Sequence, residues 1–247
     1  MKMTGNTILI TGATSGIGRA LAGAFHDRGN RVIVTGRRQA LLDQITAERP
    51  DMIGLTLDLA DSSSLTHLSA EIRGSFPELN VLIANAGVSR AEDTTAEGWD
   101  AADAEAIVAT NILGVLRVTA AVLPLLKETP NATIMATSSN LAFVPRADFP
   151  SYCASKAFLH SWLQSLRHQL RKIPIEVLEL APPYVQTELT GAQQAAIRPR
   201  CRFPPISLRS CNCWSCGFIP AARCWSSATA PAAGPSATAS TRPPSRP

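Results

Sequence analysis

The stretch Thr11-Gly12-Ala13-Thr14-Ser15-Gly16-Ile17-Gly18 decides the fold. It follows the apolar run 7–10 and leads into residues 19–25, where apolar side chains recur at helical spacing. A strand, a glycine turn and a helix start form a cradle for phosphate, because glycine lets an anion approach the backbone amides and the helix offers unpaired N–H groups. The spacing Gly-x-x-x-Gly-x-Gly differs from the better-known Gly-x-Gly-x-x-Gly fingerprint. Alone, it is also compatible with a purely structural turn.

Strand-like and helix-like segments alternate along the rest of the first 180 residues. Near-continuous apolar runs predict strands at 7–11, 31–35, 52–57, 80–84, 132–137 and 174–180. Helical periodicity predicts helices at 17–29, 38–49, 62–74, 98–127 and 151–172. Strict alternation with short connections implies right-handed crossovers and a parallel sheet. We therefore expect a single-domain α/β fold, a Rossmann-like doubly wound parallel sheet flanked by helices, with its ligand at the carboxyl ends of the strands.

A tyrosine and a lysine stand one helical turn apart at the start of the segment 151–172. Residues i and i+4 share one face of a helix, so Tyr152 and Lys156 project together. A free tyrosine has a pKa near ~10 and is a poor acid or base at neutral pH. A nearby ammonium, together with the positive ring of an oxidised nicotinamide, would favour the phenolate and lower that pKa.

Two further polar residues fall where they could assist this pair. Ser139 follows the predicted strand 132–137, thirteen residues before Tyr152, and could hydrogen-bond a carbonyl oxygen on which charge develops. The neighbouring Ser138 could serve instead, although the spacing favours Ser139. Asn111 would complete the set from within the preceding helix.

Together these motifs resemble the short-chain dehydrogenase/reductase family over about residues 3–192. The sequence at 141–145 and 165–170 looks closest to that of a bacterial branch of the family labelled after the D-alanine–lipoteichoic acid operon. The resemblance implies that Tyr152 is the general acid/base, that Lys156 lowers its pKa and binds ribose, that Ser139 orients the carbonyl and that Asn111 supports a proton relay. It also implies a set of cofactor-binding residues that includes Tyr152 and Lys156, the others being Gly12, Thr14, Ser15, Gly16, Ile17, Gly18, Asp58, Leu59, Asn85, Ala86, Gly87, Pro182, Val185 and Thr187.

The end of the second predicted strand carries the signal for cofactor choice. NAD-selective proteins place an acidic residue there to bind the ribose 2′-OH. Here the strand ends in Gly36-Arg37-Arg38. Because guanidinium groups suit a phosphate, we expect NADP(H) rather than NAD(H), with Arg37 the first choice and Arg38 the second. Alternatively, Arg37 and Arg38 are two solvated side chains at the start of a helix and contact no cofactor.

Other polar residues have simpler interpretations beside the functional ones. Asp58 matches the residue that meets the adenine edge in the family, but it could be an ordinary helix cap. Histidines 26, 67, 160 and 168 fall on predicted helices without the spacing of metal ligands, so we expect surface or satisfied side chains and no metal. Substrate identity cannot be read from the sequence beyond an alcohol or carbonyl compound.

The chain changes character near residue 197. Glu188 is the last acidic residue, and the segment 197–247 holds seven arginines, no lysine, five of the six cysteines and nine of the eighteen prolines. The formal charge is +4, but without this segment 16 basic residues face 19 acidic ones. The basic balance therefore belongs to this tail. We divide the chain into a catalytic domain at 1–196 and a tail at 197–247 that we expect to be disordered.

A shifted reading frame would explain the tail. The shifted reading takes the third base of each codon together with the first two bases of the next codon. With permitted codons, Pro205 to Ser215 can then be re-read as Asp-Phe-Ile-Ala-Glu-Leu-Gln-Leu-Leu-Glu, which has the pattern of an amphipathic helix. The shift would lie between about Ala192 and Pro205. A thiolate zinc site at Cys211, Cys213 and Cys216 and an arginine-rich contact with nucleic acid are weaker alternatives, because the cysteine spacing is irregular and the arginines are sparse.

The tail leaves two functional hypotheses. The first is an NADP(H)-dependent oxidoreductase; the second is a frame-disrupted relative that binds dinucleotide with little or no activity. A chain so altered would lack the helix and seventh strand that the family places last, so the homo-oligomer usual there is doubtful. No run of ~18 apolar residues and no secretory signal is evident, which predicts a cytoplasmic protein without a membrane partner. The sparse arginines of the tail predict no nucleic-acid partner.

Overall fold

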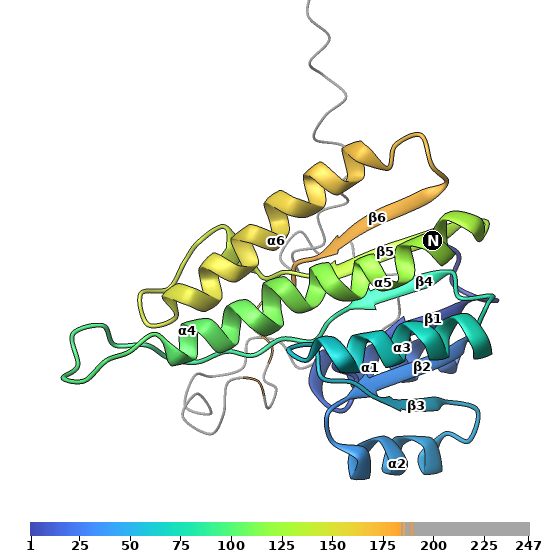
Figure 1. Ribbon diagram of the computed structural model, residues 1–247, viewed down its shortest axis with the longest axis horizontal. Helices are drawn as coiled ribbons and strands as arrows, with labels where there is room; N and C mark the ends of the chain where they lie inside the picture. The colour runs from blue at the N-terminus through green and yellow to red at the C-terminus, as the bar shows by residue number, and fades with distance from the viewer. Residues whose placement is uncertain (184, 186–188, 190–247) are drawn as a thin grey trace, which may run out of the picture.

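The computed structural model describes residues 1–183, 185 and 189 (Figure 1). The expectations for Thr187, for the tail 197–247 and for a missing last helix and strand lie outside these residues. The strands are β1 (Thr7–Ile10), β2 (Arg31–Gly36), β3 (Ile53–Thr56), β4 (Val81–Ala84), β5 (Ala132–Thr137) and β6 (Ile175–Leu180). The helices are α1 (Gly16–His26), α2 (Gln39–Glu48), α3 (Ser62–Ser75), α4 (Ala102–Ile107), α5 (Gly114–Glu128) and α6 (Pro150–Gln169), with a π-helical turn η1 (Val108–Leu113) and a 3₁₀ turn η2 (Asn140–Ala142).

All six strands form one parallel sheet in the order β3-β2-β1-β4-β5-β6. The chain moves outward from β1 to β3, and then crosses back to place β4 on the other side of β1. The loops after β1 and β4 therefore diverge at neighbouring strand ends. In open α/β sheets this reversal point is where ligands bind, and the predicted fold class is confirmed.

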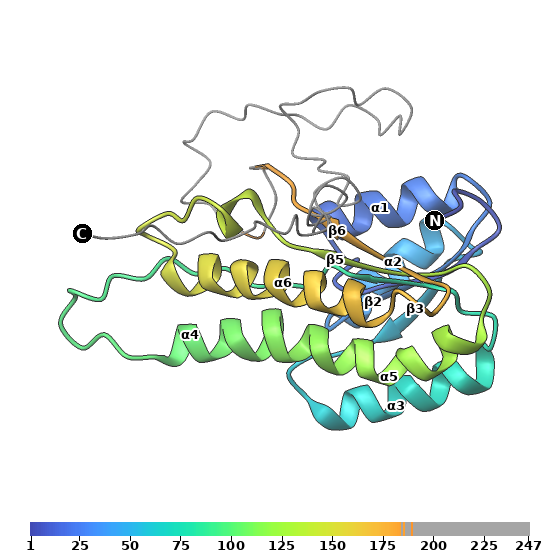
Figure 2. The same cartoon turned by 90° about the horizontal axis from the view of Figure 1, so that it is seen from above.

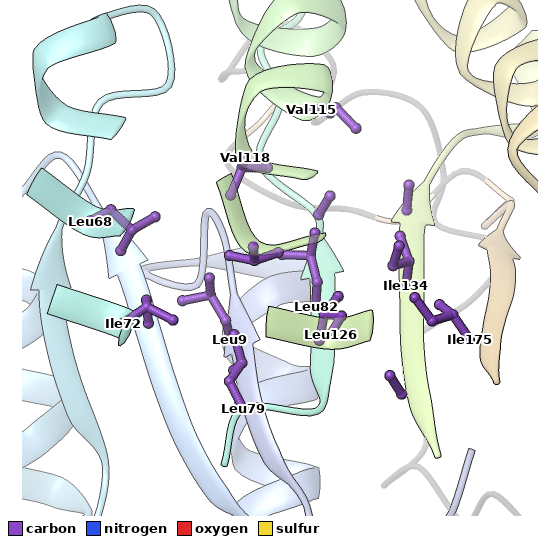
Figure 3. Packing of buried hydrophobic residues seen from close by; sticks show 14 of the residues in the cluster. Leu9, Leu68, Ile72, Leu79, Leu82, Val115, Val118, Leu126, Ile134 and Ile175 are labelled. Carbon is purple, nitrogen blue, oxygen red and sulfur yellow. The ribbon is translucent and has the colours of Figure 1, made fainter. Parts of the chain in front are cut away.

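Alternating side chains of the strands supply two separate cores. Leu9 and Leu82 point to one face of the sheet and pack with Val118 and Ile72 in the larger core, which lies beneath α3, α5 and α6 (Figures 2 and 3). Their neighbours in the strands point to the opposite face, beneath α1 and α2. Burial on both faces explains why the strands read as continuous apolar runs. The layered core fixes the strand ends that carry the polar residues.

The predicted helix 98–127 is one stretch, Ala102–Glu128, with a π-helical turn in its middle. An 18-residue window within it has a mean hydropathy of 1.9, so by length and composition the helix is apolar enough to cross a membrane, contrary to our expectation of no such segment. Length and composition alone are weak support for a membrane span, since the core helix of a globular protein passes the same test. Here Val115, Val118, Val122 and Leu126 are buried against the sheet, which accounts for the hydropathy.

Candidate active site

A cleft of about 360 Å³ runs along the carboxyl ends of the strands. Residues that follow β1, β2, β3, β4 and β5 line it, together with the first turns of α1 and α6. Most of the predicted site residues lie on its wall, namely Gly12, Thr14, Ser15, Gly16, Ile17, Arg37, Arg38, Asp58, Leu59, Asn85, Ala86, Gly87, Tyr152, Lys156 and Pro182. Gly12 and Pro182, which are 170 residues apart in the chain, thus meet at one edge of the sheet.

Close approach of backbones explains the glycines of the cradle. Gly12 has φ +64°, and a Cβ there would lie 2.6 Å from Cα of Ala86. A Cβ on Gly18 would lie 2.4 Å from the carbonyl oxygen of Gly12. Gly18 is buried below the cleft instead of on its wall. The turn therefore holds β1, β4 and the start of α1 in contact.

The first turn of α1 faces the cleft without a cap of its own. Ser15 occupies the N-cap position, but its side chain makes no capping hydrogen bond. Helix starts of this kind present N–H groups and the positive end of the helix dipole to an anion. A bare glycine backbone and an uncapped helix start fit the pyrophosphate of a dinucleotide.

Two arginines flank the adjoining part of the cleft. Arg37 and Arg38 follow β2 and are exposed, and Arg38 Nη2 donates to Thr14 Oγ1 at 3.3 Å. Thr14 in turn lies over Gly36, whose added Cβ would meet its methyl group at 2.6 Å. The strand end therefore carries positive charge beside the glycine turn. No acidic residue occupies the positions directly after β2.

The alternative interpretation of Asp58 as a helix cap is wrong. Asp61 caps α3, because its carboxylate accepts hydrogen bonds from the amides of Ser63 and Ser64. Asp58 Oδ1 accepts instead from the amide of Ala60 at 3.0 Å, and Asp58 lines the cleft. Its position suits contact with a ligand.

Tyr152 and Lys156 lie together at the other end of the cleft, as their spacing predicts. Lys156 Nζ is 5.6 Å from the centre of the Tyr152 ring and donates to the carbonyl oxygen of Thr137 at 2.8 Å. Both side chains are buried, at 9% and 3% exposure. The Ser139 hydroxyl lies close enough to Tyr152 to act on its pKa, so the segment after β5 meets α6 at this point.

The electrostatics of the pair differ from the expectation that Lys156 lowers the pKa of Tyr152. Burial raises the pKa of Tyr152 above its usual value, and the hydrogen bond with Ser139 opposes that rise. Burial also lowers the pKa of Lys156 to about 8, because its ammonium is removed from water and no carboxylate among the described residues pairs with it. Within the described chain Ser139, rather than Lys156, is the group that favours the phenolate.

Ser138 and Ser139 use their hydroxyls differently. Ser138 Oγ donates to Glu179 Oε1 at 2.5 Å, so that hydroxyl is already engaged. Ser139 Oγ accepts from the amide of Leu141 at 3.1 Å and donates to Asn140 Oδ1 at 3.3 Å, and the same hydroxyl acts on the pKa of Tyr152. Ser138 lines the cleft and Ser139 does not, so the preference for Ser139 rests on its effect on Tyr152.

Asn111 lies within the π-helical turn and behind the cleft wall. Its amide group accepts from the amide of Val88 at 2.8 Å and donates to the carbonyl of Val88 at 2.9 Å, which pins the loop after β4. It also donates to Ser155 on α6 at 3.1 Å. Asn111 is fully buried, so its side chain joins three segments instead of lining the cleft. π-helical turns often mark functional sites.

Sequence reasoning missed part of the cleft wall. Val88, Ser89, Arg90, Thr110 and Leu189 also line it. The first three directly follow Asn85-Ala86-Gly87, so their place at a strand end could have indicated them. Val185 is described but does not line the cleft, and among described residues no cluster of three metal-ligating side chains occurs.

The buried charge of Lys156 predicts a gain in stability on its removal. A pKa of about 8 instead of 10.5 costs the folded protein about 3 kcal/mol when the lysine is charged. Lys156→Met should raise the free energy of unfolding at pH 7 by about 2 kcal/mol, because the lost bond to Thr137 offsets about 1 kcal/mol.

Urea unfolding of both proteins across pH tests this expectation. The folded pKa is depressed, so the penalty is present below about pH 8 and disappears as pH rises towards 10.5. The difference between the variant and the original chain should shrink over that window. Lys172→Met, which changes an exposed lysine, is the control. Equal effects of the two substitutions would contradict a strained buried ammonium.

Comparison with known proteins agrees with the fold. Residues 6–198 match the short chain dehydrogenase family. The chain belongs to this family, whose members are NAD(P)-dependent dehydrogenases and reductases.

Among its relatives, the oxidoreductase DltE of Bacillus subtilis is 41% identical over 192 residues, covering 76% of this chain and 75% of DltE. Sulfoacetaldehyde reductase 2 of Chromohalobacter salexigens is 36% identical over 197 residues, covering 76% and 78%. The structure of a serine dehydrogenase with NADP⁺ superposes with a TM-score of 0.69 at 29% identity, covering 74% of each chain.

Proposed function

We propose that this protein transfers a hydride between NADP(H) and an alcohol or carbonyl substrate. The observation that carries the proposal is that Tyr152 and Lys156 line the same cleft as the glycine turn, with Ser139 beside Tyr152. Within the family established above, such a cleft orients a dinucleotide beside a proton donor. When bound, the nicotinamide ring supplies or accepts the hydride.

Each residue of the site has a role that follows from its contacts. Tyr152 is the general acid in carbonyl reduction and the base in the reverse direction. Ser139 hydrogen-bonds the substrate oxygen as charge develops on it. Because Ser139 lies beside Tyr152, both hydroxyls can point at that same substrate oxygen. Lys156 contributes positive charge and ribose contacts, while Asn111 holds the loop after β4 and supports the proton relay.

The dinucleotide would extend along the remaining cleft wall. The uncapped start of α1 and the glycine turn would hold the pyrophosphate. Asp58, Leu59 and the segment 85–87 would border the adenosine, whereas Pro182 and Thr187 would meet the nicotinamide half. Arg37, with Arg38 beside it, would hold the 2′-phosphate.

The choice of NADP(H) predicts the outcome of a charge reversal at Arg37. A charge-assisted hydrogen bond contributes about 1.5–3 kcal/mol, so Arg37→Glu should weaken NADPH binding about tenfold to a hundredfold. Binding of NADH should stay unchanged or improve, because a carboxylate can accept from the 2′-OH. Fluorescence titration with both cofactors measures the effect.

Lys172→Glu is the matched control for Arg37→Glu. It makes the same change of two charge units on an exposed residue of the turn before β6, away from the carboxyl ends of the strands. It should weaken NADPH binding less than twofold. An equal loss of NADPH affinity in both variants would mean that the effect comes from net charge alone. If Arg37→Glu binds NADPH normally and Arg38→Ala binds it more weakly, Arg38 holds the 2′-phosphate.

Turnover with defined carbonyl compounds tests the reaction itself. NADPH consumption is measured with sulfoacetaldehyde and with an apolar ketone, and NADP⁺ reduction with serine, because two relatives carry sulfoacetaldehyde and serine in their names. We expect turnover with at least one of these probes. No turnover with any probe, in a chain that binds NADPH, would favour the second hypothesis below.

The second hypothesis is a frame-disrupted relative that binds dinucleotide with little or no activity. One observation favours it: the family match ends at residue 198, beside the change of composition at Ile197. We accordingly propose a catalytic domain at 1–196 and a tail of shifted frame at 197–247. Sequencing of the gene decides this, since early stops in the alternative frame would exclude a shift. We further propose a cytoplasmic protein that acts on small molecules, without nucleic-acid or membrane partners.

A further inference from the structure

A glutamate outside the expected set joins two of the elements that build the site. Glu179 lies on β6, and its side chain is only 10% exposed. Its carboxylate accepts from Ser138 Oγ at 2.5 Å and contacts His160 Nδ1 at 2.9 Å. A nearly buried carboxylate requires such partners, because its removal from water is otherwise costly.

Through His160, Glu179 contacts α6, the helix that carries Tyr152. It follows Tyr152 by eight residues and Lys156 by four, so all three share one face of α6. Its second ring nitrogen lies 2.6 Å from Gln164 Nε2, and its ring packs edge-on against Phe143 with centroids 4.6 Å apart. Partners on both nitrogens and on the ring fix the orientation of the imidazole.

Through Ser138, Glu179 also contacts the residue that directly follows β5. The amide of Ser138 donates to the carbonyl of Leu180 at 2.8 Å, which extends the pairing of β5 and β6 by one residue. Its hydroxyl is held by Glu179, so both its backbone and its side chain are fixed. Ser139 is the next residue, and its hydroxyl acts on the pKa of Tyr152.

We propose that Glu179 is a positioning residue: by holding Ser138 and His160 at once, it fixes the end of β5 against α6 and so aims Ser139 at Tyr152. The inference rests on the proposed function, because it assigns a purpose to the contact between those two hydroxyls. Glu179 touches neither of them and acts only through Ser138 and His160.

Steady-state kinetics of Glu179→Leu test the proposal. A slight misplacement of a reacting group costs up to about a hundredfold, and we expect kcat to fall about tenfold while the Kd for NADPH stays within twofold. Glu179→Gln keeps an acceptor for Ser138 and should retain most of kcat. In a Ser139→Ala background the further loss from Glu179→Leu should be under about twofold, because coupled residues are not additive.

Glu176→Leu is the matched control, since Glu176 lies on the same strand with 47% of its side chain exposed. It should leave kcat unchanged. If Glu179→Leu does not fold, Ser138→Ala removes one arm of the contact alone and should lower kcat in the same way. Full additivity with Ser139→Ala, or an equal loss of NADPH binding, would overturn the positioning role.

A second readout needs no turnover and separates this proposal from the proposed function. The chain has two tyrosines, so Tyr184→Phe leaves Tyr152 as the only signal when isotope-labelled tyrosine is titrated by NMR. Loss of a negative charge at Glu179 would lower the pKa of Tyr152 directly, whereas loss of the Ser139 contact raises it. We expect Glu179→Leu to raise that pKa, as Ser139→Ala does. An unchanged or lower pKa overturns the proposal, whether or not the enzyme turns over.

Discussion

Tyr152→Phe should abolish most of the turnover while the protein still folds and binds NADPH. A positioned proton donor contributes about 10²–10⁴-fold to a rate, so we expect a loss of at least a hundredfold in kcat. The ring of Tyr152 packs with Ile107, Phe149 and Cys153, and phenylalanine preserves those contacts. The loss should therefore lie in the chemical step, with the Kd for NADPH within about twofold.

Ser165→Ala provides the matched control for the loss of a hydroxyl from α6. Ser165 is exposed and donates only to the carbonyl of Ser161. This variant should keep full turnover with the same probe substrate. Comparable activity of Tyr152→Phe and the original chain would mean that another group supplies the proton, and the assignment of Tyr152 would be wrong.

Gly18→Ala should disrupt the dinucleotide site, because the added Cβ pushes α1 away from the glycine turn. The added Cβ would lie 2.4 Å from the carbonyl oxygen of Gly12 and 2.6 Å from Nδ2 of Asn85. Gly12 contributes backbone there, and Asn85 is held by the carbonyls of Thr11 and Gly12, so α1 must move away from the turn. Overpacking of this kind costs about 1–3 kcal/mol. We expect a melting temperature lower by several degrees and NADPH binding weaker by more than tenfold.

Gly74→Ala makes the same chemical change where there is room for it. No atom lies within 4 Å of a Cβ built on Gly74, near the end of α3. Alanine favours a helix over glycine by about 0.5–1 kcal/mol, so this variant should melt about 2 °C higher and bind NADPH normally. A Gly18→Ala protein that matches it in both respects would contradict the close packing of the cradle.

The sequence predicted those parts of the site that depend on local spacing. The four-residue interval placed Tyr152 and Lys156 on one helical face, and the glycine interval placed the cradle between β1 and α1. The strand ends then gathered the remaining cleft residues, because parallel strands share one carboxyl edge. Helix and strand limits moved by only a few residues; α1 ends at His26, where the turn through Gly29 at φ +75° begins.

Features that depend on contacts between distant segments could not be predicted. Burial of Lys156 lowers the pKa of the lysine itself, which no spacing rule reveals. The π-helical turn around Asn111 has no sequence signal of its own, and the cap of α3 is Asp61 rather than Asp58. The contact of Glu179 with Ser138 joins residues 41 positions apart. The Asp61 cap is a local contact, whereas the burial of Lys156 and the contact of Glu179 depend on the packing of the whole sheet.

Thermal melting of the full chain with NADPH, with NADH and without cofactor tests the central claim most directly. Ligand at about 100 times its Kd adds about 2.7 kcal/mol to stability, or several degrees at roughly 2–4 °C per kcal/mol. We predict one cooperative transition that NADPH raises by that amount and NADH raises less. No shift with either cofactor, or a larger shift with NADH, would contradict an NADP(H) site built from the glycine turn and Arg37.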